Sequence, residues 1–328
     1  TFWARSPERK VHARGTHARA ARPLEEKETR YWIDTVKAAR AVLDERGLRG
    51  WFQIDREGDG RDLLMALSVT EHWWTVRGNH DRSIELEGGS KEMLRAQLAT
   101  RPTVDVYELP VTGRPGRTAR VARVAVCVAS VTLRLRDRKT DKITLFPVNV
   151  VWAHEDGTAP AKEDPIDWLL FTNRSIETFA DAQLVIYGYS QRWRVEDCHR
   201  TWKSGECDIE STQLQSFAAI QRWAIILGAV ATRIERLKHL ARNKPDSPAT
   251  LELSPLEVRA LKMLKFGADA GPVETPTIAQ AVAWLAELGG WTHKYSSGRQ
   301  PGATVLGRGL RYLRPATHML AIQTGCEG

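Results

Sequence analysis

Four side chains that can bind phosphate or metal recur at helical spacing in one short segment. They carry a phenol, a guanidinium, a carboxylate and an ammonium group, and they are Tyr189, Arg192, Glu196 and Lys203. On one continuous α-helix these four positions fall in a stripe about 60° wide. A carboxylate flanked by cations suits a metal ion beside a phosphate. The ordinary alternative is an i,i+4 pair of Arg192 and Glu196 on a solvated face.

A second carboxylate, Asp55, directly follows the apolar segment Trp51–Ile54, which has the pattern of a buried strand. The end of a strand in an α/β sheet is where ligands usually bind, although an Asp at this position can also cap the next helix. A strand-end Asp and a helix-borne Glu together suit a hard cation such as Mg²⁺. Two such ions about 4 Å apart can bind the attacking and leaving oxygens of a phosphoryl transfer.

The elements that must position these carboxylates alternate at first between helix and strand. Apolar spacing predicts a helix over Leu24–Arg46, a strand at Trp51–Ile54, a short helix over Asp62–Val69 and a strand at Trp73–Val76 that ends at Arg77. This alternation is typical of an α/β fold.

From Asp81 to about Thr172 the pattern changes to β-rich runs separated by turn clusters, which predicts an antiparallel β insertion. The runs are Val104–Tyr107, Arg120–Arg136, Ile143–Trp152 and Trp168–Phe171. After them Ser175 can cap a helix that continues to Gly205 with a possible break at Gly188. The remainder is mostly helical. Its predicted features are a long helix over Gln213–Arg242, a capping box at Ser254–Glu257, and a helix from Thr275–Pro276 through Leu288.

Composition and charge narrow the class of protein. The 328 residues suffice for about two domains, and 48 Lys and Arg against 40 Asp and Glu give a net charge of +8, which suits a polyanionic partner. The basic segment from Arg5 to Pro23 is either a solvated loop or a DNA contact.

The longest apolar run, Trp223–Ala231, is too short for a bilayer, which needs about 20 residues. The four cysteines form no CxxC pair and no secretory signal is present, so we expect reduced thiols in a cytoplasmic protein.

The spacing Tyr-x2-Arg-x3-Glu-x6-Lys resembles the signature of bacterial insertion-sequence DDE transposases of the IS-four group, which includes the Tn-five transposase. Further matching segments follow in the same order along nearly the whole chain. They are Asp55–Asp59, Trp168–Thr172, Lys203–Gly205, Leu288–Gly290 and Pro301–Gly302.

The resemblance implies an α/β fold with an RNase H-like core, interrupted by the β insertion and followed by a helical C-terminal dimerisation domain. We expect core segments at 1–80 and 173–208, the insertion at 81–172 and the helical domain at 209–328. The implied activity is cleavage of transposon ends and strand transfer into target DNA. The implied partners are double-stranded DNA and a second copy of the chain, in the bacterial cytoplasm at the nucleoid.

The resemblance also assigns roles to single residues. Asp55 and Glu196 would be the second and third acidic ligands of Mg²⁺ or Mn²⁺. The phosphate backbone of the transposon end would be held by three residues, Tyr189, Arg192 and Lys203. Trp168 would stack on a flipped base, or else be a core tryptophan. Arg77 would be a further DNA contact, or else a surface charge.

One departure from the family pattern concerns its first catalytic Asp, which lies on an earlier strand. Asp34 and Asp44 fall in the predicted first helix, so we expect this ligand upstream of residue 1. The chain alone should then bind metal weakly, cleave no DNA and expose the backbone edge beside Trp51–Ile54. If it cleaved DNA, the missing carboxylate would be sought among Asp59, Asp62 and Asp197. The alternative function is a non-catalytic transposon-end-binding or oligomerisation module that inhibits transposition. A stand-alone RNase H-like nuclease fits the long helical C-terminal region less well.

Overall fold

The computed structural model describes residues 22–113, 115–157, 159–160, 163–267, 275–292 and 300–325. The chain divides into two compact units, Thr1–Arg192 and Trp193–Gly328. The first unit is mixed α/β and the second is helical. The basic segment from Arg5 lies outside the described residues except for its last two positions, and Cys326 also lies outside them. The other three cysteines are free thiols, as the sequence predicts.

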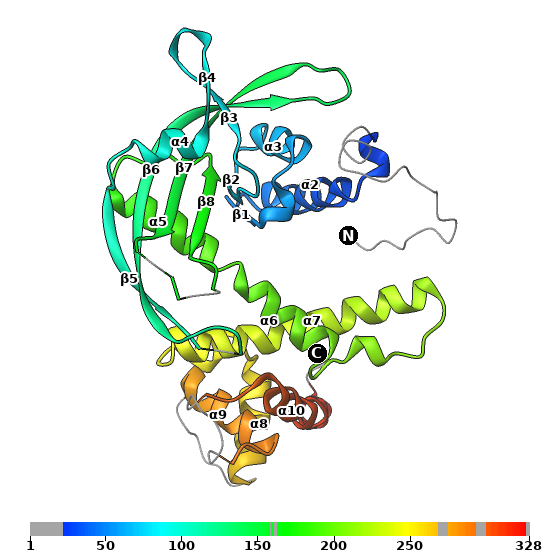
Figure 1. Ribbon diagram of the computed structural model, residues 1–328. Coiled ribbons are helices and arrows are strands. Elements are labelled where there is room, and N and C mark those ends of the chain that lie inside the picture. The colour runs from blue at the N-terminus through cyan, green and yellow to red at the C-terminus, as the bar shows by residue number, and fades with distance from the viewer. Residues whose placement is uncertain are drawn as a thin grey trace. The chain divides into compact units, whose positions relative to one another are not determined.

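One sheet organises the first unit, and in its described residues it has eight strands (Figure 1). Their order is β1-β2-β8-β7-β6-β3-β4, with β5 paired to β6. Only β1 and β2 run parallel, with Trp51 opposite Trp73, and the remaining pairs are antiparallel. The strands are β1 (Trp51–Ile54), β2 (Trp73–Arg77), β3 (Ser83–Glu85), β4 (Lys91–Met93), β5 (Asp105–Val111), β6 (Arg120–Arg136), β7 (Ile143–Glu155) and β8 (Asp167–Thr172).

Helices cover both faces of this sheet (Figure 1). Because parallel strands need a crossover connection, α3 (Arg61–Ser68) lies between β1 and β2 in the chain and packs with α2 (Thr29–Glu45) on one face. The helix α5 (Phe179–Ser190) packs on the other face. Within the described residues β1 pairs with β2 alone.

The strands of the segment predicted to be an insertion, residues 81–172, join the same sheet rather than forming one of their own. The link is β8, which pairs with β2 on one side and β7 on the other. The predicted runs at Trp51–Ile54 and Arg120–Arg136 are strands with those bounds. The sequence did not predict β3, β4 and the short helix α4 (Leu94–Ala99), because segments of three to six residues carry too few apolar positions to set a period.

The helix predicted from Ser175 to Gly205, with a possible break at Gly188, is two helices, and the break lies at residues 191–192 instead. Thr178 caps α5 through a capping box with Asp181, and a second helix, α6 (Trp193–Lys203), starts after a break at residues 191–192. At the break the Arg192 N–H donates to the Tyr189 carbonyl, three residues back, at 3.0 Å. Such i→i−3 bonds tighten and end a helix. Arg192 therefore lies in a turn rather than on the predicted helical stripe.

Gly188, where a break seemed possible, is inside α5 for a packing reason. A Cβ at this position would lie 2.7 Å from the Trp51 ring. Glycine thus lets α5 approach β1 closely and does not interrupt the helix.

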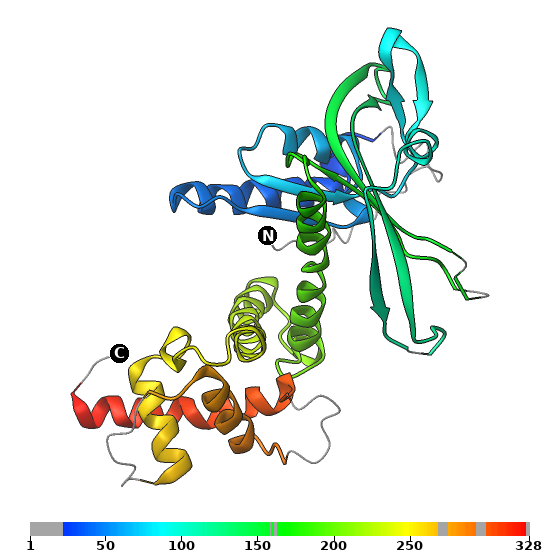
Figure 2. The same cartoon turned by 90° about the vertical axis from the view of Figure 1, so that its left-hand side faces the viewer.

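In the described part of the second unit, four helices surround an apolar core (Figure 2, yellow-green to red), and α6, in green, packs against the first of them. The predicted capping box of Ser254 and Glu257 is confirmed, whereas the cap of α9 is Thr277 rather than a residue of Thr275–Pro276. Gly309 contacts the Leu285 carbonyl, and a Cβ at this position would collide with it. The glycine therefore lets the backbones of α10 and α9 approach each other closely. The four helices are α7 (Phe217–Asn243), α8 (Pro255–Phe266), α9 (Ile278–Leu288) and α10 (Ala303–Thr324).

Among the described residues, α7 is the one helix long and apolar enough to cross a membrane, with a mean hydropathy of 1.3. A single helix of this kind is weak evidence. Its residues Leu227, Ala231 and Ile234 are buried within the second unit, but only 22% of its most apolar 18-residue stretch is buried.

A buried carboxylate, Asp59, fixes the loop that follows β1. Its Oδ2 accepts hydrogen bonds from the backbone N–H groups of Asn79 and His80 at 2.7 and 3.2 Å. Its Oδ1 accepts from Arg82, whose Nε lies at 2.9 Å. The Asp59 side chain is fully buried, so all of its charge is compensated by these donors.

We expect Asp59→Asn and Arg82→Ala each to lower the free energy of unfolding by about 3–5 kcal/mol, because each leaves a buried group without its partner. Urea denaturation followed by circular dichroism measures the loss. The control is Asp62→Asn, whose carboxylate is partly exposed and pairs with Lys27 at 3.3 Å; this variant should lose about 0–1 kcal/mol. Equal losses in all three variants would contradict the role of Asp59.

Candidate functional site

Asp55 lies directly after β1, as predicted, and its two carboxylate oxygens have different surroundings. Oδ1 accepts from the backbone N–H of Glu57 at 2.9 Å and caps the 3-10 turn Arg56–Gly58. Oδ2 faces Arg192 Nη1 at 3.8 Å, and both side chains are about a quarter exposed (28% and 22%). Asp55 thus caps a 3-10 turn rather than the next predicted helix, whose N-cap is Gly60. Its other oxygen accepts no hydrogen bond from the described residues.

Glu196 and Lys203 keep part of the predicted arrangement, since both belong to α6. Seven residues apart, they share one helix face, with about 10 Å between them along the axis. The opposite face is fixed to α7, because Thr201 Oγ1 donates to Glu235 at 2.6 Å and Trp202 Nε1 donates to the Ala224 carbonyl at 3.1 Å. In the part of the chain that the structure describes, Lys203 is exposed and makes no ion pair. Glu196 is half-buried.

Tyr189 does not share that face. It belongs to α5, is 4% exposed, and packs in the core beneath the sheet. Its ring meets the ring of Trp168 edge to face, with centroids 5.4 Å apart. Trp168 is only partly buried, so it has the packing of a core residue on one side and an accessible surface as well.

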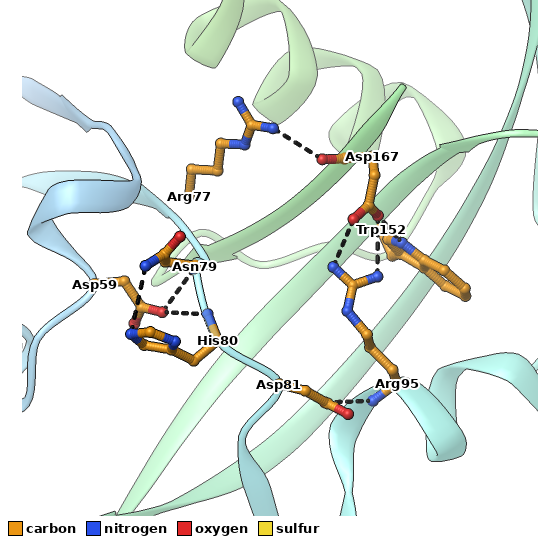
Figure 3. A network of polar contacts seen from close by, with 8 residues as sticks. All are labelled: Asp59, Arg77, Asn79, His80, Asp81, Arg95, Trp152 and Asp167. Atoms are coloured by element: carbon orange, nitrogen blue, oxygen red, sulfur yellow. Dashed lines mark hydrogen bonds and ion pairs between the residues drawn. The ribbon is translucent and has the colours of Figure 1, made fainter. Parts of the chain in front are cut away.

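Arg77 ends β2 and donates from Nη2 to the backbone carbonyl of Asp167 at 3.1 Å (Figure 3). The Asp167 carboxylate is in turn held by Arg95, whose two terminal nitrogens lie 3.0 and 2.7 Å from its oxygens. Trp152 Nε1 also donates to it at 2.8 Å. Four elements thus meet at Asp167, one residue before Trp168.

The charge of Asp167 is maintained by these partners. Burial alone raises the pKa of this carboxyl, but the hydrogen bonds from Arg95 and Trp152 outweigh burial, so its pKa lies below the ordinary value. The sequence did not identify Arg95 or Trp152. Arg95 is 72 residues from Asp167 in the chain, and only the folded sheet brings the two together.

The other candidate carboxylates are engaged elsewhere. Asp59 is saturated by Arg82 and two N–H groups. Asp62 pairs with Lys27 at 3.3 Å, and Asp197 pairs with Arg200 at 3.0 Å. The described residues contain no group of three His, Cys, Asp or Glu side chains that could hold a metal ion. Asp55 and Glu196 offer hard oxygens of the type that Mg²⁺ prefers, and they belong to different units of the chain.

Comparison with known protein families gives a match to the model described as "Transposase DDE domain". The match covers residues 18–233, which is more than half of the chain. It includes Asp55, Arg77, Trp168 and the whole segment from Tyr189 to Lys203.

We expect Arg95→Ala to lower the free energy of unfolding at neutral pH by about 1 kcal/mol, because the Asp167 carboxylate is 40% exposed and keeps part of its hydration. A depressed folded-state pKa adds stability above the unfolded pKa of about 3.9, and this stability disappears as pH falls through the folded value. The difference between wild type and variant should therefore shrink between pH 5 and about pH 3 in urea titrations. A difference that stays constant with pH would contradict this account.

Proposed function

The chain belongs to the DDE transposase family, and from that premise we propose that Asp55 and Glu196 are the metal-binding carboxylates of a site that cuts transposon ends and joins them to target DNA. As a DDE transposase domain the chain acts on DNA. The spacing of Tyr189, Arg192, Glu196 and Lys203 further supports the IS-four group. The observation that carries the proposal is the strand-end position of Asp55, with one oxygen that makes only a weak ion pair with a guanidinium.

The arrangement of the first unit supports an RNase H-like core. Its support is the parallel pair β1 and β2 with α3 between them, and a carboxylate directly after β1. We propose the core at 1–80 and 173–208, with the insertion at 81–172 and a helical dimerisation domain at 209–328. A second copy of the chain and double-stranded transposon ends and target are then its partners.

The residues present fit a divalent cation in donor type. When bound, Mg²⁺ or Mn²⁺ supplies an activated attacking oxygen and stabilises the leaving oxygen of the phosphodiester. In this proposal Asp55 and Glu196 hold the ion through hard carboxylate oxygens. Arg192 and Lys203 orient the backbone by binding its phosphates.

The ion pair of Arg192 with Asp55 suggests how the two ligands assist each other. At 3.8 Å and partly exposed, it is a weak contact. A phosphate that draws Arg192 away leaves the charge of Asp55 available to a cation, and a cation at Asp55 releases Arg192 for phosphate. Metal and DNA should therefore bind more tightly together than separately.

Three further residues are proposed DNA contacts. The accessible side of Trp168 can stack on an unpaired base while its buried side rests on the Tyr189 ring. Tyr189 is then mainly a support for Trp168, with its hydroxyl the part that could reach a phosphate. Arg77 donates to the Asp167 carbonyl through one terminal nitrogen, which leaves a second one for DNA.

We expect Glu196→Gln and Asp55→Asn, in the natural protein that carries this sequence, to abolish Mg²⁺- or Mn²⁺-dependent end cleavage and to leave end binding largely intact. Each amide keeps the side-chain shape but loses the charge that holds the ion. The measurement is cleavage of a labelled transposon-end duplex beside a gel-shift assay, with Glu210→Gln, an exposed acid after α6, as control. Cleavage by Glu196→Gln at the wild-type rate would falsify the assignment. Binding without any cleavage by the wild type would favour the inhibitory, non-catalytic alternative.

We expect Arg192→Ala and Lys203→Ala each to weaken binding to end DNA and to reduce the slope of log affinity against log salt by about one, because each removes one phosphate contact. Fluorescence anisotropy across a salt series measures the slope. Lys37→Ala, which removes the same charge from an exposed position of α2, should change the slope less. An unchanged slope in both Arg192→Ala and Lys203→Ala would show that these side chains are ordinary solvated charges that do not contact DNA.

A further inference from the structure

Two arginines and two tryptophans form a stacked cluster at the start of β1 and β2, at the end of these strands opposite Asp55. The Trp51 and Trp73 rings meet edge to face, with centroids 6.3 Å apart. The guanidinium carbon of Arg174 lies 4.7 Å from the Trp51 centroid and 4.3 Å from the Trp73 centroid. The guanidinium carbon of Arg49 lies 4.2 Å from the Trp73 centroid. We call these four residues the Arg–Trp cluster.

The cluster is held in place by the surrounding backbone and side chains. Trp51 Nε1 donates to Thr75 Oγ1 at 3.0 Å, which fixes the indole on the face of the sheet that α5 covers. The Asn173 amide bonds to the backbone on either side of Trp73, accepting from the following N–H and donating to the preceding carbonyl, each at 2.9 Å. These bonds fix the turn that carries Arg174.

The two guanidinium groups lack the carboxylate partners that several other arginines of the first unit have. Arg82, Arg95 and Arg120 each pair with an acid, but neither Arg49 nor Arg174 makes an ion pair within the described ranges. Arg49 uses only Nε, on the Glu71 carbonyl at 3.0 Å.

The Nε of Arg174 is buried and donates to no acceptor in the structure. The acid that it influences, Asp181, already accepts from Thr178 N–H and Oγ1 at 2.9 and 2.8 Å in the capping box of α5. The positive charge of the cluster is therefore not neutralised by the fold.

We propose that the Arg–Trp cluster binds the phosphodiester backbone of DNA as a second contact, separate from the residues around Asp55. The inference rests on the proposed function in one respect, that the chain binds DNA. A guanidinium stacked on an indole keeps its in-plane N–H donors, and its planar fork matches two oxygens of a phosphate. Trp51 and Asp55 are four extended residues apart, about 13 Å, which about four nucleotide steps of one strand cover.

The first test compares salt dependence of binding to a duplex of random sequence. The double variant Arg49→Gln/Arg174→Gln should reduce the slope of log affinity against log salt by about two, and each single variant by about one. Arg101→Gln removes an exposed arginine that has no ring neighbour and no ion pair in the described residues, and it should leave the slope unchanged. Circular dichroism and thermal unfolding establish that the variants are folded before their slopes are compared.

The second test needs no substitution. Phenylglyoxal modifies accessible arginines, and mass spectrometry reads the modification of each peptide. Arg49 should be modified in the free wild-type chain and protected at saturating DNA, whereas Arg101 should be modified equally in both. An unchanged slope in the double variant together with equal modification of Arg49 would overturn the cluster as a DNA contact. Failure of the wild-type chain to bind any duplex would instead overturn the proposed function, and the inference with it.

Discussion

The buried carboxylate of Asp59 is the constraint on which the geometry around β1 and β2 depends. A charge removed from water is stable only if hydrogen-bond donors surround it. Here the donors are two N–H groups just beyond β2 and the guanidinium of Arg82 at the start of the insertion. The loop after β1, which carries Asp55, is thereby tied to the point where the chain leaves the first strands for the insertion. These hydrogen bonds hold the segment that carries Asp55, so the position of Asp55 depends on a residue four places further on.

A second charged group, Asp167, performs the matching task where the insertion returns to the sheet. Its carboxylate joins α4 and β7 through Arg95 and Trp152, and its carbonyl receives Arg77 from β2 (Figure 3). The chain leaves the sheet after β2 and returns in β8, which pairs with β2, so two junctions lie at this point of the sheet. Asp59 and Asp167 fix them with charged hydrogen bonds, while the antiparallel pairing of β8 with β2 provides the backbone contacts. Because Trp168 directly follows Asp167, these hydrogen bonds also fix the backbone position of Trp168.

The sequence predicted the parts of the fold that apolar periodicity determines. Trp51–Ile54 and Arg120–Arg136 are strands because their buried positions leave a pattern that a reader can follow. The break before α6 left no such trace, since residues 191–192 include neither Gly nor Pro and the helix ends only by a switch to i→i−3 bonding. Gly188 suggested a break where there is none, because the close approach of α5 to Trp51 requires a glycine at this position. Among the candidate site residues, Asp55 was proposed from its position at a strand end, and the structure places it directly after β1. Arg95 and Trp152 were not proposed, because pairs joined only by tertiary folding have no fixed spacing in the chain.

The two proposed metal ligands belong to different compact units of the chain. Asp55 is positioned by β1, the turn after it and the Asp59 network, all within the first unit. Glu196 is positioned by α6, which Thr201 and Trp202 fasten to α7 in the second unit. Each carboxylate therefore depends on a different apolar core. A substitution that loosens α6 on α7 acts on Glu196 and Lys203 together, because both lie on one rigid helix. The same substitution leaves the capping bond of Asp55 to Glu57 intact. Loss of either hydrogen bond between α6 and α7 should therefore lower the proposed metal-dependent reaction through Glu196 and Lys203. Loss of the donors to Asp59 should lower the same reaction through Asp55.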